Sequence, residues 1–456
     1  MKIKKLELEN FRCFKEYKLA FSDRFTLLIG DNGSGKTAIL DALALAVSEF
    51  LIGFSRVQKP FALPSISIDD VRYETLSMGQ SLIKETPYMA LLSVTGNINN
   101  VPISWSFSKK TSGQIELTDT VASIRNIAFR YAQGITEANT FLPVISYYGT
   151  GRLWNEAKKY YNSPFYLYNS RRIRKEAPEN IGISRPNSRL LGYRDCLNSA
   201  KRLQQLFGWF KTQELAALQK QELRYVLEAV REAIVSMIPG AQNVWWDVDW
   251  DEILIETTIQ GKSQTIPFHL LSDGYRNMIG MVADIAYRMA TLNPQLKANV
   301  IKQTEGIVLI DEIDLHLHPK WQKQVVGRLL DTFPKIQFVA SSHSPFIIQS
   351  LYHREDCLLW DLEKNAPVEV DSKSIEDIAE NQQGVEIPQQ SQRFLAMEKA
   401  AEEYYTVLKQ IPPAGEDEKQ RLRQRLDELL LPYSDDPAFQ AFLKMERQAV
   451  EGSAEE

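Results

Sequence analysis

Gly30-Asp31-Asn32-Gly33-Ser34-Gly35-Lys36-Thr37 is the stretch that decides the fold of this 456-residue chain. An apolar run suited to a strand, Phe25 to Ile29, precedes it, and an apolar run suited to a helix, Ala38 to Phe50, follows it. Its glycines permit backbone angles that turn successive N–H groups toward phosphate oxygens, and the positive end of the following helix favours the same negative charge. The order of strand, glycine-rich turn and helix predicts a P-loop in an α/β fold.

The polar positions of this turn have predicted partners in a bound nucleotide. Lys36 would reach the β- and γ-phosphates of ATP, and the Thr37 hydroxyl would be a ligand of Mg²⁺. The rest of the predicted phosphate cradle is Asn32, Gly33, Ser34 and Gly35. The alternative is a glycine-rich turn that only precedes a buried helix, which the strand before and the helix after the turn disfavour. ATP and Mg²⁺ are therefore the predicted cofactors.

A second apolar run ends in two carboxylates. Gly306-Ile307-Val308-Leu309-Ile310 is followed directly by Asp311 and Glu312. We expect Asp311 to hold Mg²⁺ together with Thr37, and Glu312 to orient or deprotonate the attacking water as a catalytic residue. Acidic residues at strand ends also aid solubility, so this motif gains its weight from the P-loop that accompanies it.

A third apolar run, Phe338-Val339-Ala340-Ser341-Ser342, leads directly into His343. In an open parallel sheet, ligands bind at the carboxyl ends of the strands, where this histidine would lie. We predict that His343 contacts the γ-phosphate as a second catalytic residue. A purely structural hydrogen bond is the alternative for this side chain.

Together with Leu271-Ser272-Asp273-Gly274, these motifs resemble the ABC-type ATPase heads of the SMC, RecF and OLD group. The resemblance implies that Ser272 and Gly274 of one subunit cap the γ-phosphate held by the P-loop of another. ATP hydrolysis would then take place at composite sites in a homodimer or a higher even-numbered oligomer. The resemblance also places Asp314 at the seam between subunits, and it brings Arg12, near the end of the first strand, toward the nucleotide.

Two departures from this group affect the interpretation. Asp273 and Tyr275 stand where transporter-type members usually have Gly and Gln, which favours the DNA-associated branch over a membrane transporter. No obvious Gln loop follows the P-loop. The apolar run and polar turn from Pro143 to Arg152 could take its place, or could be a simple exit from a strand.

The order of the motifs and the local composition predict four segments in an α/β P-loop NTPase with an ABC-type ATPase head. An N-terminal ATPase lobe with an antiparallel β arm covers 1–150, and a basic helical insertion covers 151–240. A C-terminal ATPase lobe with Ser272, Asp311 and His343 covers 241–375, and an acidic helical tail covers 376–456. The chain between P-loop and signature shows no sustained heptads, which excludes the long coiled-coil arm of SMC proteins.

Composition indicates a large globular enzyme. With 456 residues and 44% hydrophobic content, the chain can bury a substantial core in two or three subdomains. We expect no apolar stretch of the ~20 residues needed to cross a membrane, and therefore no membrane partner. The three cysteines, Cys13, Cys196 and Cys357, lack metal-ligand spacing, which fits a reducing cytoplasm.

Charge is unevenly distributed along the chain. Residues 151–200 hold ten Lys or Arg against four Asp or Glu, a local charge of 10 − 4 = +6. The cations, interleaved with aromatic residues such as Tyr193, are Arg152, Lys158, Lys159, Arg171, Arg172, Arg174, Lys175, Arg185, Arg189 and Arg194. This mixture suits DNA or RNA, and equally a protein interface or a solvated surface.

The tail at residues 391–456 is acidic, with nine basic and fourteen acidic side chains. We expect it to dock on the chain itself or to recruit another protein.

The elements that are missing narrow the function. No Asp-x-Asp follows His343, so we expect no Toprim nuclease of the OLD type. Complete ATPase motifs, the turn from Tyr147 to Leu153 and a short acidic tail resemble the PtuA family of Septu anti-phage systems. That family acts with a separate HNH nuclease, PtuB. The leading hypothesis is an ATP-dependent sensor and scaffold that controls a PtuB-like HNH nuclease. The alternatives are a RecF-like DNA-repair clamp and an AriA-like ATPase that sequesters a toxin.

Overall fold

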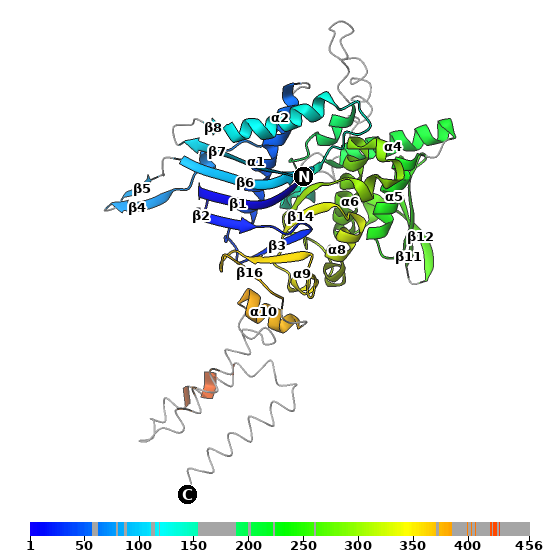
Figure 1. Cartoon of the computed structure of the whole chain (residues 1–456). Coiled ribbons are helices and arrows are strands. Elements are labelled where there is room, and N and C mark those ends of the chain that lie inside the picture. Colours follow the sequence, from blue (N-terminus) through cyan, green and yellow to red (C-terminus); the bar gives the residue numbers. More distant parts are fainter. Residues whose placement is uncertain are drawn as a thin grey trace. The chain divides into compact units, whose positions relative to one another are not determined.

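The structure is a computed structural model of the whole chain (Figure 1). The residues that it describes are 1–56, 63–78, 81–85, 89–110, 115–117, 119–153, 188–198, 202–221, 224–259, 261–370, 374–384, 399, 403, 406, 420, 421, 423–425 and 428. The chain divides into two compact units, Met1–Ile375 and Glu376–Glu456, and all the predicted site residues lie in the first. Helix α10, Ile375–Gln383, begins at their boundary. The division into four segments remains a prediction.

The centre of the first unit is a sheet with five parallel strands and one antiparallel edge strand. In spatial order its strands are β16 (Ala366–Val368), β15 (Cys357–Asp361), β3 (Phe25–Ile29), β14 (Ile336–Ser341), β13 (Gly306–Ile310) and β9 (Val144–Tyr148). Every residue of β3, β13 and β14 is buried, which explains why apolar residues predominate in these strands without alternation. Their carboxyl ends meet at one edge of the sheet, where the three predicted motifs therefore come together.

A second, antiparallel sheet confirms the predicted β arm. Its strands in spatial order are β2 (Phe14–Ala20), β1 (Lys2–Phe11), β6 (Met89–Ile98), β7 (Val101–Lys110) and β8 (Ile115–Leu117). The turn between β6 and β7 is Asn99-Asn100, with φ of 49° and 63°, the left-handed angles that two-residue hairpin turns require. A separate hairpin pairs β4 (Glu74–Met78) with β5 (Ser81–Glu85). A third sheet contains β10 (Ala241–Asp247), β11 (Glu252–Ile259) and β12 (Lys262–Pro267).

Helix α1, Lys36–Ile52, contacts both of the larger sheets through β6, β13 and β14. Trp105 of β7 donates a hydrogen bond of 3.1 Å from its indole N–H to the Ala46 carbonyl of this helix. The stretch Lys36–Ser55 is long and apolar enough to cross a membrane, and 83% of its most apolar window is buried inside the protein. The expectation that no apolar stretch reaches this length was wrong, because a helix enclosed between two sheets is apolar on all sides.

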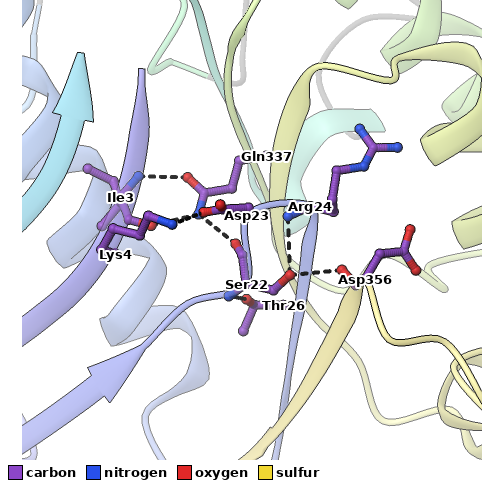
Figure 2. A network of polar contacts seen from close by, with 8 residues as sticks. All are labelled: Ile3, Lys4, Ser22, Asp23, Arg24, Thr26, Gln337 and Asp356. Atoms are coloured by element: carbon purple, nitrogen blue, oxygen red, sulfur yellow. Dashed lines mark hydrogen bonds and ion pairs between the residues drawn. The ribbon is translucent and has the colours of Figure 1, made fainter. Parts of the chain in front are cut away.

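Gln337 of β14 joins the two larger sheets (Figure 2). Its side-chain amide accepts a hydrogen bond from Ile3 N and donates one to Ile3 O, both of 2.7 Å. It also donates to Ser22 O at 2.8 Å, and the Ser22 hydroxyl in turn donates to Asp356 O at 2.8 Å. Gln337 is completely buried, and its side chain satisfies the backbone N–H and C=O of Ile3 in β1, which does not pair with β14.

The remaining helices pack on one another and against strands of the three largest sheets. They are α2 (Asp119–Gln133), α4 (Arg202–Lys220), α5 (Tyr225–Met237), α6 (Asp273–Leu292), α7 (Val300–Gln303), α8 (Pro319–Thr332) and α9 (Pro345–Gln349). Short 3-10 helices occur at η1 (Gly53–Arg56), η2 (Ile68–Asp70), η3 (Thr150–Leu153), η4 (Ser188–Tyr193), η6 (Phe268–Leu270) and η7 (Pro294–Asn299). Because α6 carries the signature residues at its N-terminus and packs against β9, it connects the signature to the central sheet.

Candidate nucleotide site

The P-loop backbone has the angles that a phosphate cradle needs. Gly30, Gly33 and Gly35 have φ of 141°, 89° and 101°, which side-chain-bearing residues rarely adopt. Gly35 caps the N-terminus of α1 in the left-handed conformation, so the helix dipole begins at the cradle. A Cβ on Gly35 would overlap the Phe14 ring and the Cys13 sulfur. The turn between β1 and β2 is therefore pressed against the P-loop.

Lys36 lies across the cradle. Its ammonium donates hydrogen bonds of 2.7 Å to the carbonyls of Gly30 and Asp31, and the residue is only 7% exposed. Burial lowers the pKa of this ammonium, and the nearby carboxylates of Asp311 and Glu312 act in the opposite direction. An added anion would stabilise this buried cation, because its direct hydrogen-bond partners are neutral carbonyls. The geometry thus suits the binding of a phosphate group.

Asp311 connects the P-loop to the neighbouring strands. Its Oδ2 accepts a hydrogen bond of 2.9 Å from the Thr37 hydroxyl, and its Oδ1 accepts one of 2.5 Å from the Ser341 hydroxyl. The Ser341 oxygen also accepts from Glu312 N at 2.8 Å. Ser341 therefore orients both acidic residues, a role that no sequence motif predicted. The available signal was a strand that ends in two serines instead of apolar residues.

Thr37 and Asp311 fit the predicted magnesium site in chemistry and in number. Hydroxyl and carboxylate oxygens are hard ligands, and Mg²⁺ in NTPases takes one or two protein ligands and completes its shell with phosphate oxygens and water. In the described part of the chain, no group of three or more His, Cys, Asp or Glu residues could hold a metal ion by itself. A metal ion held by Thr37 and Asp311 would therefore take its remaining ligands from the nucleotide and from water.

Glu312 has a backbone conformation that is unusual for a residue with a side chain. Its φ is 49°, in the left-handed region, and Ile313 N donates to Ser341 O at 3.0 Å to hold the following turn against β14. Such angles cost on the order of 1–3 kcal/mol and are found at functional sites. The side chain is half-buried, and its charge acts on Lys36, which places it near the phosphate cradle.

His343 is exposed directly after β14. The Ser342 hydroxyl donates to Asp314 Oδ1 at 2.6 Å and accepts from Ser344 N at 2.9 Å. The residue before His343 is therefore tied to the turn that carries Asp314. This connection links the predicted γ-phosphate contact to the predicted seam residue within a single subunit.

The predicted signature residues lie at the N-terminus of α6. Ser272 is exposed at the N-cap of α6, whereas Gly274 is buried. A Cβ on Gly274 would overlap the His316 carbonyl, and Asn277 donates to Leu315 O at 3.2 Å. The N-terminus of α6 thus packs on the turn that follows Asp311 and Glu312. Packing within the chain is one reason for glycine at 274, in addition to the approach of another subunit that the resemblance implies.

Arg12 is held by two carboxylates. Its Nη1 donates to Asp41 Oδ2 at 2.5 Å, and its Nε donates to Asp70 Oδ1 at 2.8 Å. Asp41 belongs to the P-loop helix and Asp70 to η2, so the guanidinium joins these two elements. These contacts use two of the five N–H donors of the guanidinium, and the role in nucleotide binding that the resemblance implied stays a prediction.

The exposed tip of the P-loop contains Asn32 and Gly33. Asp31 N, one of the amides that could face a phosphate, donates to Glu363 Oε1 at 2.7 Å. Glu363, which no sequence motif indicated, lies two residues beyond the end of β15, the strand that pairs with the P-loop strand β3. Ser34 completes the cradle, with its hydroxyl 3.4 Å from the Lys36 ammonium.

Most of the basic stretch at 151–200 lies outside the described residues. Two of its residues that are described, Arg189 and Tyr193, have structural roles, and the alternatives for the stretch as a whole stay predictions. Arg189 donates to the carbonyls of Leu292 at 2.7 Å and Ile135 at 2.6 Å, and Tyr193 is fully buried and donates to Pro143 O at 2.8 Å.

A family model described as an AAA domain matches residues 5–240, more than half of the chain. The chain belongs to this AAA-domain family. A second model, described as "AAA domain, putative AbiEii toxin, Type IV TA system", matches residues 167–349 of the AAA-domain chain.

Curated relatives of this AAA-domain chain include two from bacterial systems. The Retron Vc95 probable ATPase of Vibrio cholerae serotype O1 biovar El Tor is 26% identical over 399 residues, which cover 77% of this chain and 72% of that protein. Septu protein PtuA of Bacillus mycoides (strain KBAB4) is 26% identical over 377 residues, 79% of this chain and 41% of that protein. The predicted class, a P-loop ATPase with similarity to PtuA, is confirmed.

Among solved structures, the SMC head bound to the C-winged helix domain of ScpA aligns with a TM-score of 0.46 and 16% identity. The alignment covers 81% of this AAA-domain chain and 98% of that chain.

Proposed function

We propose that this ATPase binds and hydrolyses ATP as a subunit of an anti-phage defence complex, and that nucleotide-dependent assembly controls a partner HNH nuclease. The observation that carries the proposal is the contact between Thr37 and Asp311, which joins the P-loop to the acidic strand. Similarity to a Septu PtuA and to retron ATPases supports the defence context.

Residues at the sheet edge would divide the hydrolysis reaction among themselves. Lys36 and the P-loop amides would bind the phosphates, and Thr37 and Asp311 would hold Mg²⁺, which supplies charge neutralisation on the phosphate oxygens. Glu312 would accept the proton of the attacking water. His343, exposed after β14, would contact the γ-phosphate.

Exposure of the signature supports a site shared between subunits. Ser272 faces solvent at the N-terminus of the 20-residue helix α6, and Leu270 beside it is 65% exposed. A helix N-terminus carries positive potential and unpaired N–H groups, which suit the γ-phosphate of a nucleotide held by another copy. We therefore propose a homodimer or a higher even-numbered oligomer as the hydrolysing form.

Two variants separate binding from hydrolysis. Lys36→Ala should abolish ATP binding, measured by isothermal titration calorimetry, whereas Glu312→Gln should bind ATP and hydrolyse it at least roughly 100-fold more slowly. The ATP-trapped Glu312→Gln protein should form a larger species than the Lys36→Ala protein in sedimentation velocity. Full hydrolysis by a species of single-subunit mass would refute the composite site.

Partner control needs a separate test. The full chain is co-expressed with the PtuB-type HNH nuclease of a Septu system, and DNA cleavage is compared between wild type and Glu312→Gln. Nucleotide-dependent nuclease activity supports the proposal. Absence of a complex, together with ATP hydrolysis that DNA alone stimulates in the pure protein, would favour a RecF-like clamp.

A further inference from the structure

We propose that Glu252 is a positioning residue that sets the signature loop for ATP hydrolysis in the neighbouring subunit. The inference rests on the proposed composite site. Glu252 lies at the first position of β11, far along the chain from the P-loop, and no motif of the sequence analysis includes it.

The register of the third sheet brings Glu252 to the signature loop. Strands β11 and β12 pair antiparallel, with Leu254 opposite Pro267 as their last pair. Continued by two residues, this register places Glu252 opposite His269, in the 3-10 helix η6 that leads to Ser272. Beyond the last backbone pair, the Glu252 carboxylate accepts the hydrogen bond of His269 N in place of a backbone carbonyl.

Both oxygens of this carboxylate bind the same residue. Oε1 accepts a hydrogen bond from His269 N at 2.8 Å, and Oε2 lies 2.7 Å from His269 Nδ1. A carboxylate can only accept, so the pairing assigns the ring proton to Nδ1. The Glu252 side chain is only 7% exposed, which strengthens both interactions relative to a pair in water. His269 is thereby fixed through its backbone and its ring.

Neighbouring contacts make η6 a rigid connection between His269 and the signature. Phe268 is buried and packs edge-on against Phe207, with ring centroids 5.4 Å apart. Leu271 N donates to Phe268 O at 3.2 Å, which closes the turn immediately before Ser272. A displacement of His269 would therefore be passed directly to the signature serine.

The position of Ser272 depends on these anchors because the loop around it is open. Leu270 is 65% exposed and Ser272 is also exposed. Gly274 packs on the His316 carbonyl and holds the loop from the other side. Glu252 and Gly274 thus fix the two ends of the segment that would meet the γ-phosphate. An error of about 1 Å in such a segment can lower a reaction rate by roughly 100-fold.

The test uses complementation between inactive subunits of the full-length protein. Glu252→Ala should bind ATP with a Kd within about two-fold of wild type, yet lower kcat by roughly 10- to 100-fold. Mixing it with Lys36→Ala should restore hydrolysis, because each mixed dimer pairs an intact P-loop with an intact signature loop. Misfolding of the Glu252→Ala subunit could not produce this recovery, since that subunit must supply the working P-loop.

Three controls complete the experiment. Glu252→Gln should keep part of the activity, because its amide oxygen can still accept from His269 N. Glu256→Ala, on the same strand, should hydrolyse ATP like wild type. The pair Ser272→Arg with Lys36→Ala measures complementation through the signature itself.

The outcomes separate the two proposals. Recovery with the Ser272→Arg pair but none with the Glu252→Ala pair would reject the role of Glu252 and leave the composite site standing. No recovery with either pair would reject the composite site, and the role of Glu252 with it. Unchanged kcat in Glu252→Ala alone would also overturn the inference.

Discussion

The Thr37 hydroxyl donates a hydrogen bond of 2.9 Å to the Asp311 carboxylate, although 274 residues separate them in the chain. The contact exists because β3 and β13 both pair with β14, so the residues beyond their carboxyl ends lie on one edge of the sheet. Both oxygens are ligands that Mg²⁺ accepts, and their proximity defines the place where nucleotide and metal would meet.

Removing the Thr37 hydroxyl should weaken the response to magnesium. We expect Thr37→Val to raise the Mg²⁺ concentration that supports half-maximal ATP hydrolysis by roughly 10-fold or more, because one hard ligand is lost. Thr37→Ser keeps the hydroxyl and should stay close to wild type. The measurement is steady-state hydrolysis across a Mg²⁺ titration at fixed ATP. Identical titration curves for the valine and serine variants would contradict the assignment.

Substitution of Gly274 should destabilise the isolated subunit. A Cβ there would overlap the His316 carbonyl, so Gly274→Ala should lower the free energy of unfolding by about 1–3 kcal/mol without nucleotide. Gly208→Ala is the matched control, since a Cβ at that helical position meets nothing within 4 Å and alanine favours a helix. Urea unfolding measures both. Wild-type stability combined with lost ATP-driven pairing would mean that Gly274 serves only the contact between subunits.

Gln337 should contribute strongly to the stability of the head. Gln337→Leu leaves Ile3 N and Ile3 O without their partner in a buried position, which should cost about 2–4 kcal/mol. Gln324→Leu, at an exposed position of α8, should change stability by less than about 0.5 kcal/mol. Equal unfolding midpoints in urea for the two variants would show that the bridge between the sheets is dispensable.

Cys357 should be slow to alkylate in the folded protein. Burial raises the pKa of its thiol to about 12, and the Asp356 carboxylate adds to the rise. Iodoacetamide reacts with the thiolate, so labelling at about pH 8.5 should be at least roughly 10-fold slower than in the urea-unfolded chain. Peptide mass spectrometry gives the rate at this one residue.

The raised pKa of Cys357 has a matching effect on stability. The neutral thiol is favoured in the fold, so its contribution is complete below the ordinary thiol pKa and is lost as the pH rises toward about 12. Equal labelling rates in the folded and unfolded chains would contradict this environment for the thiol.

The sequence predicted the structure best where a local pattern of residues is compatible with a single type of element. The apolar runs at 25–29 and 306–310 form β3 and β13 with the same bounds. Strands buried on both faces are apolar throughout, and this pattern is visible in a single sequence. The predicted α/β fold with an antiparallel arm is confirmed for the same reason.

Contacts between residues that are distant in the chain could not be predicted from the sequence. Ser341 orients Asp311, and Glu363 binds Asp31 N, through strand neighbours that only the sheet order reveals. The sequence grouped Arg189 by charge with its neighbours, but its guanidinium donates hydrogen bonds to backbone carbonyls. Composition identifies a cation but does not show which acceptors the fold brings to it.

The order of strands in the central sheet has a consequence for biosynthesis. β3, which ends at the P-loop, pairs only with β14 and β15 among the described strands, and these lie at 336–341 and 357–361. During translation, β3 has no strand to pair with until residues 336–341 of β14 have been made. Such distant pairings fold slowly. We therefore expect a nascent chain released before residue 336 to expose the unpaired edge of β3 and to rely on chaperones, and we expect nucleotide binding to begin only after β14 has been made.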